Sequence, residues 1–181
     1  MDKINEKISW NTQWKLDKFN DQNNTIAKAL QLGMPIKEAI AQFGKAYIGS
    51  EQFSSNVALN EGLGELIDII CGLGTPTKWD NTNARLGVGD SSTGAVATQT
   101  GLQATTNKAY KAMDTSYPAR TNQTIEFRST FGSGDANYAW EEYTVVNAAD
   151  DTGKNLNRKC ASKGTKSSGE TWVLSLQITF S

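Results

Sequence analysis

The last segment of the chain carries the sequence pattern that most restricts its fold. Between residues 172 and 180, large apolar side chains occupy every second position and alternate with smaller or polar ones. The apolar members are Trp172, Leu174, Leu176, Ile178 and Phe180. Side chains at a period of two lie on one face of a β-strand, so this segment presents a continuous hydrophobic wall. The pattern predicts a strand that lies inside a sheet.

Further short strands are predicted before this segment. The candidates are residues 85–89, 125–131, 138–146 and 156–160. Turn sequences rich in glycine, aspartate and serine separate them, at 132–135, 150–153 and 163–169. Short alternating strands with turns at near-regular spacing are typical of antiparallel sandwiches and small barrels. We therefore expect a mainly β fold, an antiparallel β-sandwich or small barrel, over about residues 79–181.

One helix is expected to pack against this sheet. Within residues 56–73, apolar side chains recur at intervals of three and four, which is the spacing of one helix face. Gly62 and Gly64 lie inside this segment, and each costs a helix about 1 kcal/mol relative to alanine. Interior glycines allow another backbone to approach closely, so the helix is expected to lie flat against the sheet. Residues 56–181 would then form one globular module that begins with this helix.

Residues 1–55 have a different character, because their apolar residues are scattered among polar and charged ones. A helix is predicted to begin near Pro35, since proline is tolerated in the first helical turn. The segment is too thin to build a core, and we expect an N-terminal helical or extended arm outside the module. In such an arm, Trp10, Trp14 and Phe19 would bind the groove of a partner or a neighbouring subunit.

The composition argues against several functional classes. Histidine is absent, which removes the usual general base at neutral pH and the commonest zinc ligand. The formal net charge of −1 argues against binding to nucleic acid, and no segment approaches the roughly 20 apolar residues of a membrane span. Cys71 and Cys160 lack the CxxC spacing, so two buried free thiols are expected, with a disulfide as the alternative. We expect no metal and no cofactor, and synthesis in a reducing cytoplasm without a signal peptide.

No local motif predicts a catalytic site. Residues 87–93 look like a phosphate loop but lack its Gly-Lys-Ser/Thr ending, and residues 150–153 lack the distal glutamate of a calcium loop. Glu141 and Glu142 would point to opposite faces of a strand, and we interpret them as surface carboxylates. The chain is therefore expected not to be an enzyme.

A basic stretch surrounds Arg158 and Lys159. Three further lysines lie close to it in the sequence, Lys154, Lys163 and Lys166. A solvated hairpin is the simpler interpretation of this stretch. The alternative is a docking patch for an acidic protein surface, in which Arg158 and Lys159 would bind the partner.

A series of motifs follows in order along residues 56–181. They are LNEG at 59–62, LIDIICG at 66–72, LGVGDSST at 86–93, LQA at 102–104, MD at 113–114, YP at 117–118, FRSTF at 127–131, ANYAWEE at 136–142, LNRK at 156–159, GTK at 164–166 and TW at 171–172. Together they resemble a group of small structural proteins of tailed bacteriophages, some of which stand alone and some of which form domains of tail-fibre-like chains. The likeness does not extend to the first 55 residues. It implies a virion protein that is made in the host cytoplasm.

Three hypotheses are compatible with the residues and with this resemblance. The first is a capsid decoration (cement) protein that binds the outside of the major capsid protein lattice and copies of itself, for which a trimer is one arrangement. The second is a tail or fibre-attachment protein, although no heptad run for a trimeric shaft is present. The third is a glycan-binding module for the host surface, with an aromatic platform. Its platform would come from Trp79, Tyr110, Tyr117 and Trp140.

Overall fold

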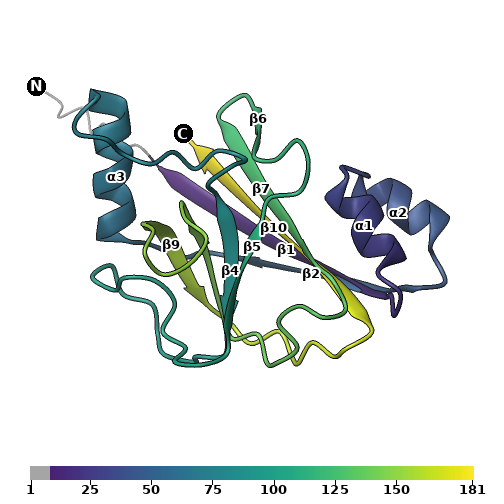
Figure 1. The fold of residues 1–181 in the computed structure, drawn as a ribbon. Coiled ribbons are helices and arrows are strands. Elements are labelled where there is room, and N and C mark those ends of the chain that lie inside the picture. Colours follow the sequence, from purple (N-terminus) through teal and green to yellow (C-terminus); the bar gives the residue numbers. More distant parts are fainter. Residues whose placement is uncertain (1–8) are drawn as a thin grey trace, which may run out of the picture.

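Ten strands form two antiparallel sheets of five strands each in the computed structural model, which describes residues 9–181 (Figure 1). Sheet A has the strand order β2-β1-β10-β7-β6, and sheet B has the order β3-β9-β8-β4-β5. Sheet A contains β1 (Trp10–Asn20), β2 (Tyr47–Ser54), β6 (Ala119–Thr121), β7 (Thr124–Phe131) and β10 (Glu170–Phe180). Sheet B contains β3 (Val57–Ala58), β4 (Arg85–Gly89), β5 (Lys108–Ala112), β8 (Glu142–Val146) and β9 (Asn155–Cys160). The expected mainly β fold is confirmed, and it is consistent with an antiparallel β-sandwich.

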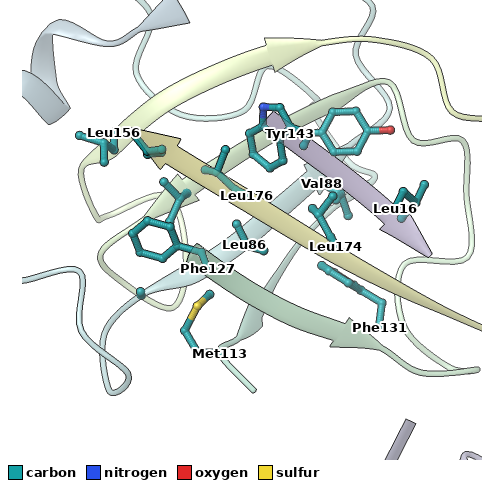
Figure 2. Close-up of a cluster of buried hydrophobic side chains, with 14 of the residues drawn as sticks. Leu16, Leu86, Val88, Met113, Phe127, Phe131, Tyr143, Leu156, Leu174 and Leu176 are labelled. Atoms are coloured by element: carbon teal, nitrogen blue, oxygen red, sulfur yellow. The ribbon is translucent and has the colours of Figure 1, made fainter. Parts of the chain in front are cut away.

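The closing strand β10 lies at the centre of sheet A, between β1 and β7. Trp172, Leu174, Leu176 and Ile178 are buried in the main core, and Phe180 packs at its edge. Figure 2 shows Leu174 and Leu176 close to Leu86 and Val88, which come from sheet B. The alternation in the sequence therefore predicted both the strand and the face that it buries.

Edge-to-face aromatic contacts fill one part of this core. The Trp140 ring lies 4.8 Å from the ring centre of Phe131 and 4.8 Å from that of Trp172. Trp14 and Tyr143 are 5.8 Å apart and link β1 of sheet A to β8 of sheet B. Aromatic pairs in these geometries are favourable beyond their buried area, so they help to fix how the sheets face each other.

The predicted N-terminal arm is wrong for residues 9–55, which contribute two strands to the sandwich. β1 pairs along its whole length with β10, from Trp10 opposite Phe180 to Asn20 opposite Glu170, and its other edge pairs with β2. The division into an arm at 1–55 and a module at 56–181 therefore does not hold. Charged residues such as Lys15 are tolerated in β1 because an antiparallel sheet can turn one face to water.

Two short helices cover one end of the outer face of sheet A. They are α1 (Thr25–Gln31) and α2 (Ile36–Gln42), and α2 begins directly after Pro35, as expected. Phe19 points from β1 into a second, smaller core with Leu30 of α1, Ala39 of α2 and Val173 of β10. The third helix, α3 (Asn60–Cys71), lies at the opposite end of the molecule (Figure 1).

Candidate interaction surface

The three aromatic residues that were expected to bind a partner belong to the interior. Trp14 and Phe19 are fully buried, and Trp10 is half-buried with its ring edge against Phe180, 5.5 Å away. The partner-binding role predicted for Trp14 and Phe19 is therefore wrong. The charged neighbours of Trp14 were misleading, because Lys15 and Asp17 leave β1 on its other face.

Arg158 is also buried, so the predicted basic docking patch does not form around it. Its guanidinium donates to Glu142 at 2.7 Å, to Gln99 Oε1 at 3.0 Å and to the carbonyl of Thr93 at 2.8 Å. Lys159 is half-buried, and its Nζ lies 3.1 Å from Ser55 Oγ. Arg158 therefore holds residues 90–107, the long segment between β4 and β5, against sheet B.

The Glu142 carboxylate completes this arrangement, and its interpretation as a surface group is wrong. It is fully buried and accepts hydrogen bonds from the backbone N–H groups of Gln103 at 2.8 Å and Ala104 at 2.7 Å. Together with the Arg158 guanidinium, these donors occupy both carboxylate oxygens. The pair is structural, because neither group is left free for a substrate.

A second buried ion pair holds a covering segment, helix α1, against sheet A. Arg128 Nε donates to Asp114 Oδ2 at 2.8 Å, and its Nη2 donates to the carbonyl of Leu30 in α1 at 2.8 Å. Burial raises the pKa of Asp114, against the opposing effect of hydrogen bonds from Thr130 and Arg128. Each outer face of the sandwich thus has a covering segment that a buried arginine–carboxylate pair holds in place.

Lys166 is the third buried cation of the described region. Its Nζ donates to the carbonyl of Gly132 at 2.7 Å and to Asn137 Oδ1 at 2.9 Å. Burial lowers the pKa of Lys166 to about 8. The amine serves internal hydrogen bonds rather than a surface patch.

Lys166 gives the protein an unusual pH dependence. Between pH 8 and 10 the folded protein releases this proton while the unfolded chain keeps it, so stability should rise with pH in this window. The window ends near pH 10, where tyrosines of the unfolded chain ionise and buried ones such as Tyr143, with a raised pKa, do not. Urea midpoints at about pH 8, 9 and 10 measure the rise. Lys166→Met should flatten it, and Lys154→Met, at an exposed lysine, should retain it; equal slopes in all three proteins would contradict this role.

α3 contacts sheet B through a glycine and two aliphatic residues. A Cβ atom at Gly62 would overlap the backbone of Asn155 and Leu156 in β9, so only glycine permits this contact. Leu66 and Ile69 follow on the same side of the helix and pack against the main core. The expected close backbone approach is therefore found at Gly62.

The opposite side of α3 carries several apolar residues that no other part of residues 9–181 covers. We name Leu63, Gly64, Ile67, Ile70 and Leu73 the α3 face. Ile70 is 75% exposed, and Ile67 and Leu73 are each 55% exposed. Such a concentration of exposed apolar side chains in a folded protein makes the α3 face a candidate contact surface.

The five residues of the α3 face are uncharged, and Asp68 lies at its border beside Gly64. The other two carboxylates of α3 bind backbone groups of the chain. Glu61 Oε1 accepts a hydrogen bond from the backbone N–H of Asn155 at 2.9 Å, and Glu65 Oε1 accepts one from that of Thr77 at 2.6 Å. Both carboxylates are thus engaged within the chain. The exposed Val96 extends the apolar surface, because the carbonyl of its neighbour Ala97 binds the N–H of Asn60 at the start of α3.

The aromatic platform of the glycan hypothesis does not form from the residues expected to build it. Trp140 is fully buried and Trp79 is only 8% exposed. The Tyr110 hydroxyl donates to Asp151, and the Tyr117 ring lies 4.4 Å beneath the Arg128 guanidinium. These rings are occupied by contacts inside the chain.

Within residues 9–181, no three side chains of the metal-binding types gather into a group, and no helix is long and apolar enough to cross a membrane. Both thiols are free, but the expected burial is wrong for Cys71, which is exposed beside the α3 face. Cys160 is half-buried. The described residues thus define a class, a two-sheet antiparallel sandwich with one uncovered apolar helix face. Comparisons with models of protein families, with curated proteins and with solved structures find no match.

Proposed function

We propose that this chain is a structural protein of a tailed-bacteriophage virion, a capsid decoration protein that binds the outside of the capsid lattice and stabilises it. The observation that carries the proposal is the α3 face. It is an exposed apolar surface, suited to contact with another protein, on a sandwich whose buried carboxylates and cations serve internal contacts.

The requirements of a particle component agree with this architecture. A protein that repeats over a lattice makes the same contact many times, so it needs a rigid module and a surface suited to protein. The paired sheets and the fastened outer segments supply the rigidity, and the α3 face supplies the surface. The ordered motifs between residues 56 and 181, which resemble phage structural proteins, supply the context.

Copy number in purified virions tests the proposal. Quantitative mass spectrometry against the major capsid protein should give on the order of hundreds of copies per particle, because a decoration protein follows the symmetry of the shell. A count of a few copies per particle would place the protein in the tail or a fibre and would overturn the decoration role. Absence from the particle would overturn the structural role as a whole.

A further inference from the structure

We propose that the α3 face binds the α3 face of a second copy of this chain, with the two helices antiparallel about a two-fold axis beside Ile67. The inference rests on the proposed function in one respect, that the α3 face is a protein-docking surface. Its test needs only the purified protein.

The spacing of residues around Ile67 is self-complementary. In an antiparallel pair centred on Ile67, a residue three positions before it faces the residue three positions after it in the other helix. Gly64 of one copy then faces Ile70 of the other, and the missing side chain of the glycine makes room for the isoleucine. Leu63 faces Cys71 at the next level, four positions from the centre. In both pairs a large side chain of one helix lies opposite a small residue of the other. The two-fold axis repeats each pair on the other side of Ile67.

Gly64 is an independent sign of a close partner. A glycine inside a helix costs about 1 kcal/mol relative to alanine. Gly62 is explained by the backbone of β9, but a Cβ atom at Gly64 would have no described atom within 4 Å. None of the residues 9–181 therefore requires glycine at this position. A helix that approaches from outside does require it, because the bare backbone lets the two helices come together.

The charges favour a second copy in antiparallel orientation. The five residues of the face are uncharged, and Asp68 lies at its border, one helical turn from Gly64 and from Cys71. The last turn of α3 has no basic residue, and its first turn contains Glu61. An antiparallel partner brings the positive end of its own helix dipole to each negative end, which is favourable.

The contact is small, and its affinity should be modest. A helix of 12 residues is roughly 18 Å long, so a single helix pair with Val96 at its border lies near the lower limit for a specific interface. We expect a dimer with a dissociation constant on the order of 10 µM. Such an interface assembles at high local concentration, as on the surface of a particle.

Sedimentation velocity of the purified full chain, from about 1 to 200 µM, tests the dimer. The wild type should shift from monomer to dimer, and Ile70→Asp should remain monomeric at every concentration. Leu32→Asp is the matched control, because Leu32 is 79% exposed in the region of α1 and lies outside the α3 face. Circular dichroism confirms that each variant is folded. A wild type that stays monomeric throughout, or that forms trimers, would overturn the proposal.

Disulfide trapping tests the register. Under oxidation at dimer-forming concentration, Leu63→Cys should form a covalent dimer through Cys71 of the second copy. The wild type should not, because its two Cys71 residues lie roughly 12 Å apart along the helix axis, beyond disulfide reach. Leu63→Cys combined with Cys71→Ser should lose the covalent dimer. A wild type that cross-links through Cys71, with no gain from Leu63→Cys, would show parallel helices and contradict the arrangement.

The two tests fail separately. A monomeric protein that is present in hundreds of copies per virion would overturn this inference and leave the decoration role standing. An antiparallel dimer from a protein present in a few copies per virion would support this inference and overturn the decoration role.

Discussion

Replacing Glu142 by alanine is expected to lower the free energy of unfolding by about 3–5 kcal/mol, the range for breaking a buried ion pair from one side. The change leaves the fully buried Arg158 guanidinium without its counter-charge. It also leaves the N–H groups of Gln103 and Ala104 without their acceptor. Urea unfolding followed by tryptophan fluorescence measures the loss.

Two further variants make this result specific. Glu141→Ala, at the neighbouring carboxylate that binds the Ser162 hydroxyl, should change stability by no more than about 0.5 kcal/mol. The double variant Glu142→Leu with Arg158→Met should recover much of the loss, because it replaces both charges by apolar groups. A Glu142→Ala protein as stable as the wild type would show that the pair does not hold the outer segment on sheet B.

Trp14→Ala is expected to destabilise the protein by about 3–5 kcal/mol, the range for removing a large aromatic side chain from a core. Trp14 is fully buried at the middle of β1, stacked on Phe53 with ring centres 6.0 Å apart. Its removal opens a cavity between the sheets that the paired strands cannot close. The urea midpoint, compared with that of the wild type, measures the effect.

Trp10→Ala is the matched control for this prediction. Trp10 is half-buried at the edge of the core, so its loss should cost clearly less than that of Trp14. If residues before 55 formed an arm outside the fold, both variants would unfold at the midpoint of the wild type. The order of the two midpoints therefore decides whether β1 belongs to the sandwich.

Local patterns predicted the elements whose signal is complete within a few residues. β10 shows five alternating apolar residues, and α3 shows apolar residues at helical spacing with a glycine that its contact requires. β4, β7 and β9 are also found within a residue of their expected positions. In each case the strand or helix buries one face, and a single period in the sequence reports that face.

β1 was not predicted from the sequence, because its apolar side chains enter two different cores on opposite faces of the strand. Trp14 and Leu16 enter the main core, but Phe19 leaves on the opposite face for the small core under α1 and α2. This exchange breaks the simple alternation, and Lys15 and Asp17 make the segment look solvated. The strand β10 that completes its pairing is remote in sequence, so no local pattern indicates it.

The uncovered surface and the buried charges show the same limit. Arg158 and Glu142 look exposed in sequence because alternation describes a sheet with one wet face. Here the segment between β4 and β5 covers that face as well, and every residue of β8 is buried. Conversely, the spacing of Ile67 and Ile70 predicts burial, whereas the helix turns them outward. Which face of an element is covered depends on tertiary contacts that a single sequence does not display.

The pairing of β1 with β10 also determines when the protein can fold. β1 and β10 pair although about 170 positions separate Trp10 from its partner Phe180. At roughly 5–20 residues per second, synthesis delivers β10 roughly 8–30 s after β1. Contacts between such remote segments require closure of a long loop and slow the folding reaction. Sheet A cannot be complete before its central strand β10 is synthesised, whereas every strand of sheet B precedes residue 161.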